Sequence, residues 1–270
     1  MGVSDHSHDD PELGEEYDDG DDYLRREFEP IASELWSHNA KWWQDGFTAG
    51  ADPEYEEQIL PIITAWSGGR RRIVEIGTGE GQILRHLAGV EDRELLIGFD
   101  PTMEQITVAN ERGVANYLQA GANEVPLASG SFDLAIACLV FEHIPDIDGA
   151  LSEVQRLLEA GGSFLFLLNH PLFQTPDSGW VDDTSFGEQY WRVGRYLEER
   201  QNIEEVEKDV FIPFVHRTLS SYLNAAISKG LILARIYEPA PPQGFLDLAP
   251  EYYEAQYIPR LLALHFVKSY

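Results

Sequence analysis

A glycine-rich turn after a short apolar run is the feature of this sequence with the clearest chemical potential. The apolar run, residues 73–76, contains one acid, Glu75, and Gly77, Gly79 and Gly81 follow at alternate positions. Because glycine has no Cβ, the main chain of such a turn can approach a ligand closely before it enters a helix N-terminus. The pattern therefore predicts a ligand-binding loop between a strand and a helix.

The spacing of the glycines separates two kinds of ligand. A dinucleotide-binding loop has its third glycine three residues after the second, and Gln82 occupies that position here. The acid two residues before the first glycine also favours S-adenosylmethionine over a dinucleotide. A nicotinamide-dependent oxidoreductase, and a glycine loop that only turns the chain, are the alternatives at this point.

A second acid stands at the end of the next apolar run. Asp100 follows residues 95–99 and lies nineteen positions beyond Gly81. A carboxylate at a strand tip can accept hydrogen bonds from both hydroxyls of a ribose, which either cofactor contains. Alternatively, Asp100 caps a helix that begins at Pro101, since Asp is a common N-cap and Pro a common first helical residue.

At these residues and in three later segments the chain resembles the class I S-adenosylmethionine-dependent methyltransferases, in particular their small-molecule, uncharacterised bacterial branch. The later segments are 121–127, 130–133 and 139–146. The resemblance implies S-adenosylmethionine as the cofactor. The cofactor-binding residues that it implies are Glu75, Gly77, Thr78, Gly79, Gly81, Asp100, Pro101, Met103, Ala122, Asn123, Cys138 and Leu139.

This chain departs from the family pattern near the adenine. Gly121 stands where the family usually has the acid that binds the adenine amino group. The main chain of Ala122 or the side chain of Asn123 is left to make that contact.

Short apolar runs alternate with amphipathic helices after residue 69, which indicates a parallel sheet wound with helical crossovers. The predicted strands are 72–76, 94–99, 116–119, 132–138, 163–168, 231–237 and 262–268. Helices are expected to start near Gly81, Met103 and Asp148, with a later one at 218–229. The resemblance implies an α/β Rossmann-like doubly wound sheet of seven strands in the order 3-2-1-4-5-7-6, the last strand antiparallel.

Composition divides the chain into three parts. Residues 1–29 hold twelve Asp or Glu and few apolar side chains, so we expect a disordered acidic tail. Residues 30–68 carry apolar positions at helical spacing and predict an N-terminal helical lid. Residues 69–270 then form the methyltransferase domain, in which 169–215 is expected to be an irregular, aromatic substrate-binding insertion.

Histidines are the candidates for acid–base chemistry. His143 follows the fourth strand at the carboxyl edge of the sheet, where a general base could take a proton from a hydroxyl or amine acceptor. Alternatively, it packs structurally against its loop. His216 is a second catalytic candidate and His170 a candidate for substrate binding, each with a structural role as the alternative.

Aromatic side chains are the other candidates for acceptor binding. Trp36, Trp42 and Trp43 lie in the predicted lid, and Tyr190 and Trp191 in the insertion. Among them, Trp43, Tyr190 and Trp191 are the predicted substrate-binding residues. Such rings could cover a sulfonium by cation–π attraction and wall off an apolar acceptor, or they could simply form the core of the lid.

Composition also limits the partners. The net charge of −28, from 47 acidic and 19 basic residues, argues against nucleic acid. The single cysteine, Cys138, and the lack of zinc-ligand spacing predict a cytoplasmic protein without a metal site. The sequence shows neither a signal peptide nor an apolar run that spans a bilayer, so no membrane partner is expected. We expect a monomer or homodimer.

The function predicted from these features is methyl transfer from S-adenosylmethionine to an oxygen or nitrogen atom of a small-molecule acceptor. One rival is a nicotinamide-dependent oxidoreductase, which would bind NAD and not adenosylhomocysteine. The other is a non-catalytic interaction module of the same fold, whose pocket would be blocked by side chains.

Overall fold

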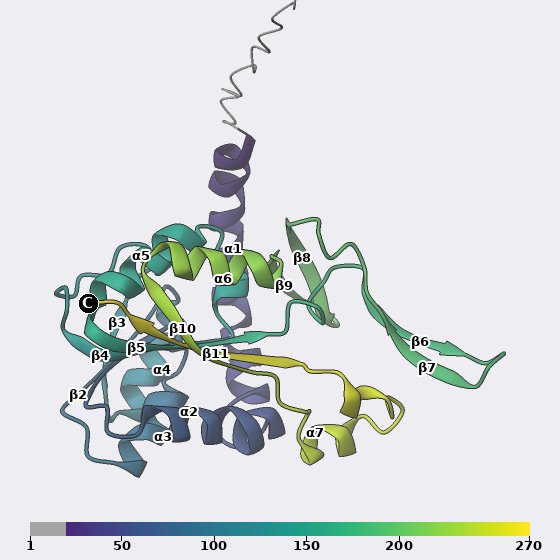
Figure 1. Cartoon of the computed structure of the whole chain (residues 1–270), viewed down its shortest axis with the longest axis horizontal. Helices are drawn as coiled ribbons and strands as arrows, with labels where there is room; N and C mark the ends of the chain where they lie inside the picture. The colour runs from purple at the N-terminus through teal and green to yellow at the C-terminus, as the bar shows by residue number, and fades with distance from the viewer. Residues whose placement is uncertain (1–19) are drawn as a thin grey trace, which may run out of the picture.

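The computed structural model describes residues 20–270 (Figure 1). Its first helix, α1 (Gly20–Gly46), contains Pro30 and begins within the segment expected to be disordered. The boundary expected at residue 29 therefore differs from the structure, and residues 1–19 lie outside the described residues. The helix extends toward Gly20 because residues 24–27 are good helix formers, and each added residue gains a backbone hydrogen bond once a helix exists.

A seven-stranded mixed sheet forms the centre of the molecule, in the order β3-β2-β1-β4-β5-β11-β10. The first five strands are parallel, and β11 pairs antiparallel with both β5 and β10. This is the predicted strand order. The strands are β1 (Arg72–Ile76), β2 (Leu95–Asp100), β3 (Asn116–Gln119), β4 (Phe132–Cys138), β5 (Leu158–Asn169), β10 (Leu231–Tyr237) and β11 (Leu261–Lys268).

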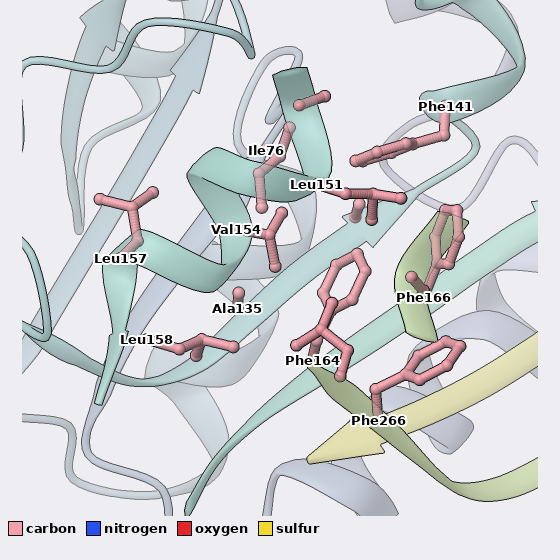
Figure 2. Close-up of a cluster of buried hydrophobic side chains, with 14 of the residues drawn as sticks. Ile76, Ala135, Phe141, Leu151, Val154, Leu157, Leu158, Phe164, Phe166 and Phe266 are labelled. Carbon is pink, nitrogen blue, oxygen red and sulfur yellow. The ribbon is translucent and has the colours of Figure 1, made fainter. Parts of the chain in front are cut away.

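Helices cover both faces of this sheet because its central strands are apolar on both faces. On one face, α5 (Ile147–Leu157) and α6 (Leu219–Ser228) pack on a cluster that includes Phe164, Phe166 and Phe266 (Figure 2). The other face is covered by η1 (Tyr55–Ile59), α2 (Leu60–Ser67) and α3 (Gln82–Val90). The remaining crossover helix, α4 (Met103–Arg112), contacts β2, β3 and α1.

The insertion after β5 is not irregular, as was expected, but contains two hairpins. One is formed by β6 (Gly179–Asp183) and β7 (Glu188–Arg192), the other by β8 (Arg200–Glu207) and β9 (Val210–His216). Aromatic and β-branched residues in these runs favour strands. The first hairpin projects away from the sheet, whereas β9 contacts α1 (Figure 1).

Three short helical elements lie in the connections between strands. The segment between β10 and β11 holds α7 (Gln243–Leu248) and η3 (Ala255–Tyr257), and a 3-10 turn, η2 (Phe141–His143), follows β4. In the part of the chain that the structure describes, no helix has the length and apolar character needed to cross a membrane.

Candidate functional site

The loop after β1 depends on glycines at positions where the backbone is left-handed. Gly77 and Gly81 have φ values of +63° and +82°, in the left-handed region that disfavours other residues. A Cβ on Gly77 would lie 2.5 Å from Cγ2 of Val140, and one on Gly81 would collide with the ring of Tyr117. The main chain of the loop is thereby held close to β4 and β3 and leads into α3.

Glu75, the last acid of β1, is buried beneath this loop. Its Oε2 accepts a hydrogen bond of 2.6 Å from the hydroxyl of Thr78. Loss of water around the carboxyl raises the pKa of Glu75 to about 8, although the Thr78 hydrogen bond opposes the rise. The carboxyl is therefore largely protonated at neutral pH, and a cation placed nearby favours its ionisation.

Asp100 at the tip of β2 ties the loop to the neighbouring strand. Its Oδ2 accepts the backbone N–H of Gly79 at 3.0 Å, and its Oδ1 accepts that of Thr102 at 2.9 Å. Burial raises the pKa of Asp100, and these two backbone hydrogen bonds oppose the rise. Since a carboxylate oxygen can accept two hydrogen bonds, each oxygen retains capacity for one donor from a ligand.

Glu80, a third buried acid near the loop, has a structural role. It is 1% exposed and forms ion pairs with Arg85 of α3 and Arg112 of α4. These pairs hold α3 and α4 together below the loop and neutralise the carboxylate. Glu80 is therefore not available to a ligand as an uncompensated charge.

A cleft opens above the loop, with an empty volume of about 960 Å³ that includes its open side. Nine of the predicted cofactor residues line this glycine-loop cleft: Glu75, Gly77, Thr78, Gly79, Asp100, Pro101, Ala122, Cys138 and Leu139.

Three predicted cofactor residues do not line the cleft. Gly81 packs against Tyr117, as described above. Met103 is half exposed on α4, because the residue before it, Thr102, is the one that turns toward the cleft. The side chain of Asn123 donates a hydrogen bond to Asp146 at 3.1 Å, and this contact holds it at the start of α5.

A second cavity adjoins the cleft, with an empty volume of about 950 Å³ that includes its open side. Four residues line both spaces and form a shared wall: Trp36, Trp43, Leu139 and His143. The second cavity extends from this wall to polar side chains in and before η1, at and after the end of β5, and just before β11. Its polar lining residues are Asp52, Glu54, Gln58, Asn169, Gln174 and Arg260.

His143 stands in the shared wall between two aromatic rings. Its ring centroid lies 4.8 Å from those of Trp36 and Phe214, and its Nδ1 lies 2.7 Å from the carbonyl oxygen of Pro213. A carbonyl only accepts, so Nδ1 carries the proton and Nε2 keeps its lone pair. Burial lowers the pKa of His143 to about 4, so the ring is neutral at neutral pH.

Aromatic rings from α1 continue the wall on either side of His143. Trp43 stacks on Phe47 at 4.5 Å and meets Trp36 edge-on at 6.0 Å. Trp42 contacts Phe47 at 5.0 Å and donates its indole N–H to Glu207 of β8 at 2.7 Å. Trp43, from the segment predicted to be a lid, thus lines both spaces.

The structure does not bring the other predicted site residues to either cavity. His216 is 2% exposed and donates to the carbonyl of Tyr196, while His170 bonds Glu238 at 2.8 Å and the Leu172 N–H at 3.2 Å. Both rings are fixed by partners within the fold, so neither faces the cleft.

Tyr190 and Trp191 also lie outside both cavities, because the hairpin that carries them points away from the sheet edge. Trp191 stacks on Phe173 at 4.2 Å and meets Trp180 at 5.4 Å, and Tyr190 is 46% exposed. These rings stabilise the hairpin.

The sequence prediction missed the polar end of the second cavity. Asp52 and Glu54 stand beside Pro53 in a segment without regular periodicity, and Arg260 lies far away in the chain. The acids Asp52 and Glu54 just before η1 were a signal of a charged site, but their neighbour Arg260 could be found only from the structure. In the described residues, no group of three or more His, Cys, Asp or Glu side chains could hold a metal ion.

Known methyltransferases are similar to this chain in sequence and in fold. Residues 74–166 match the family model of the methyltransferase domain. A structure of an S-adenosylmethionine-dependent methyltransferase from Mesorhizobium loti is 28% identical, with a TM-score of 0.66 over 78% of this chain and 96% of that chain.

Two curated proteins are similar to about half of this chain. An uncharacterized methyltransferase of Bacillus subtilis is 33% identical over 50% of this chain and 53% of its own. A ubiquinone/menaquinone biosynthesis C-methyltransferase of Rubrivivax gelatinosus is 31% identical over 53% of this chain and 55% of its own. The chain spans about half the length of the curated relatives it matches.

The strand order, the glycine loop and these matches define the class of protein. Residues 74–166 match a methyltransferase domain, and the chain is similar in sequence and in fold to S-adenosylmethionine-dependent methyltransferases. Its cofactor is S-adenosylmethionine, as the sequence predicted.

Proposed function

We propose that this chain transfers a methyl group from S-adenosylmethionine to an oxygen or nitrogen atom of a small molecule bound in the second cavity. The observation that carries the proposal is the wall shared by the two cavities, formed by Trp36, Trp43, Leu139 and His143. The two spaces are therefore neighbours, and the proposal places the reacting atoms of the two ligands at this wall. Methyl transfer requires such a meeting, because the acceptor atom must be aligned with the methyl group.

The charges of the glycine-loop cleft suit the proposed cofactor. Glu75 and Asp100 are buried carboxyls that form no ion pair among the described residues. S-adenosylmethionine brings a sulfonium and an ammonium group, which favour the ionised form of both acids. A dinucleotide would instead bring a pyrophosphate to the same loop, and this anion would disfavour the ionised form of Glu75.

Within this proposal each part of the cleft has one task. The loop between Glu75 and Gly79 holds the methionine part of the cofactor, Asp100 accepts hydrogen bonds from the ribose, and Pro101 and Ala122 border the adenine. We assign no cofactor contact to Gly81, Met103 or Asn123, which lie outside the cleft.

The bound cofactor supplies an electrophilic methyl group, so the chain mainly aligns the acceptor and excludes water. Trp36 and Trp43 give the shared wall an apolar surface. Nε2 of His143 accepts a hydrogen bond from the acceptor hydroxyl or N–H. Since the pKa of His143 is about 4, the ring does not hold a proton at neutral pH, and we propose that it orients the acceptor.

Two other functions are distinguished by specific observations. Transfer to carbon is the second candidate, because one curated relative is named as a C-methyltransferase. A non-catalytic module predicts a pocket filled by side chains, whereas the cleft has an empty volume of about 960 Å³. The net charge of −28 supports a small molecule over nucleic acid, and the single cysteine supports a cytoplasmic location.

Calorimetry tests the cofactor part of this proposal. The chain should bind S-adenosylmethionine and S-adenosylhomocysteine and should not bind NAD at the same concentration. Binding of NAD without binding of S-adenosylhomocysteine would contradict the proposal.

Isotope transfer tests the acceptor part. The chain is incubated with methyl-labelled cofactor and a mixture of small hydroxyl and amine compounds, and the products are identified by mass spectrometry. We expect the label on oxygen or nitrogen. Label on carbon, or transfer only to nucleic acid or protein, would overturn the acceptor assignment.

A further inference from the structure

The charges that line the second cavity do not cancel. Its charged lining residues are Asp52, Glu54 and Arg260. Nε and Nη2 of Arg260 lie 3.1 and 3.2 Å from the two carboxylate oxygens of Glu54, and the guanidinium packs over the ring of Phe245 at 4.1 Å. This bidentate ion pair compensates the charges of Glu54 and Arg260, and the ring of His143 is neutral. Asp52 therefore leaves one uncompensated negative charge.

Asp52 has capacity to bind a ligand. Its Oδ1 accepts the backbone N–H of Glu54 at 2.9 Å, and its Oδ2 has no hydrogen-bond partner among the described residues. Burial raises the pKa of Asp52 to about 6. The positive charge of Arg260 lowers this pKa, but by less than burial raises it. A ligand cation would supply the compensation that the fold does not.

A second, independent acceptor lines the same cavity. Gln58 is 6% exposed, and its Oε1 is buried without a hydrogen-bond partner among the described residues. The amide orientation is fixed because Nε2 donates to the carbonyl oxygen of Ala240 at 2.7 Å. A buried acceptor without a donor is costly, so the cavity is suited to a ligand that donates hydrogen bonds.

The aromatic lining favours the same kind of ligand. Trp42, Trp43 and Phe47 contact one another and line the second cavity. The faces of such rings attract cations, by roughly 0.5–2 kcal/mol for each contact. The ring faces do not attract anions in this way. Among the described residues that line the cavity, Arg260 is the only Arg or Lys, and it is already paired with Glu54.

We infer, on the basis of the proposed function, that the methyl acceptor is a small molecule with an ammonium group, which Asp52 and Gln58 bind in the second cavity. Asp52 lines the second cavity but not the glycine-loop cleft. A protonated ammonium has no lone pair with which to attack a methyl group. The ammonium is therefore the anchor, and another oxygen or nitrogen atom of the same molecule reaches the shared wall.

Three molecules of similar shape and different charge test this inference. Tyramine is a cation, tyrosol is its neutral analogue, and 4-hydroxyphenylacetate is an anion. Their dissociation constants are measured by calorimetry, with and without S-adenosylhomocysteine. Hydrogen bonds to a charged group contribute about 1.5–3 kcal/mol, so tyramine should bind on the order of ten- to a hundredfold more tightly than tyrosol. The anion should bind most weakly.

Asp52→Asn should reduce the preference for tyramine to about twofold, because the substitution removes the charge and keeps the shape. Glu56→Gln, four residues further along on an exposed side chain, is the matched control and should keep the preference. Equal binding of the three molecules, no binding of any of them, or a preference that Asp52→Asn leaves intact would overturn the inference. Binding of S-adenosylhomocysteine is scored separately, so its loss counts against the proposed function and not against the ammonium site.

Discussion

Replacement of Asp100 gives the sharpest test of the cofactor site. Each oxygen of this carboxylate accepts one backbone N–H, from Gly79 at 3.0 Å or Thr102 at 2.9 Å, and retains one position for a ligand hydroxyl. Asp100→Asn keeps the size of the side chain but leaves one acceptor oxygen, and its NH₂ group then faces a backbone N–H. The loss of a charged hydrogen bond, about 1.5–3 kcal/mol, corresponds to a ten- to hundredfold weaker cofactor affinity.

The assay is calorimetric titration of S-adenosylhomocysteine into Asp100→Asn and a control. Asp146→Asn is the control, because Asp146 also accepts a backbone N–H, from Gly149 at 3.0 Å, but lies outside the cleft. Both variants should lose some thermal stability. Only Asp100→Asn should lose affinity, and equal affinity of the two variants would refute the assignment of Asp100 to the ribose.

Three further predictions follow from the same cleft and its surroundings. Because the pKa of Glu75 is about 8 in the free protein, binding of the cationic cofactor at pH 7 should release a proton, detected as a buffer-dependent binding enthalpy that Glu75→Gln removes. Gly77→Ala should lower stability by more than about 1 kcal/mol, since a Cβ there lies 2.5 Å from Val140 at a φ of +63°, and Val140→Ala should recover part of the loss in thermal melts. Trp191→Ala should lower the melting temperature without a change in the KM for the acceptor, whereas Trp43→Ala should raise this KM. If both variants raise the KM equally, the placement of the hairpin outside the site is wrong.

Glu75 also predicts the pH dependence of stability. Its pKa in the folded chain is about 8, well above the ordinary value of 4.5, so the folded state holds a proton that the unfolded state releases. Glu75 therefore costs no stability below pH 4.5, and stability falls as the pH rises toward 8. Urea titrations of the wild type and Glu75→Gln should diverge over this interval. Parallel curves would contradict the shift.

The sheet and the cleft were predictable from sequence because their signals are local. The apolar strand 72–76 and the glycines after it occupy consecutive positions, and Asp100 ends the neighbouring strand. Parallel strands bring such ends to the same edge. Long apolar runs such as β4 must be buried on both faces, which fixes the layers of helices.

The acceptor side was harder to predict because its contacts join distant parts of the chain. Arg260 pairs with Glu54 across about two hundred residues, and the second cavity also takes Phe214 from β9 and Asn169 from β5. No periodicity identifies such partners. Aromatic content alone suggested Trp191 as well as Trp43, and only the direction of the β6–β7 hairpin separates a stabilising ring from a lining ring.

The arginines near the site show why both cavities keep a negative character. Arg85 and Arg112 are paired with the buried Glu80, and Arg260 is paired with Glu54. Among the described lining residues of the two cavities, Arg260 is the only Arg or Lys. These three guanidinium groups therefore compensate glutamates of the fold, which leaves Glu75 and Asp100 in the cleft and Asp52 in the second cavity. This distribution favours a cationic cofactor in the cleft, beside Glu75 and Asp100, and a cationic acceptor in the second cavity, beside Asp52. It disfavours phosphate-bearing ligands in either space.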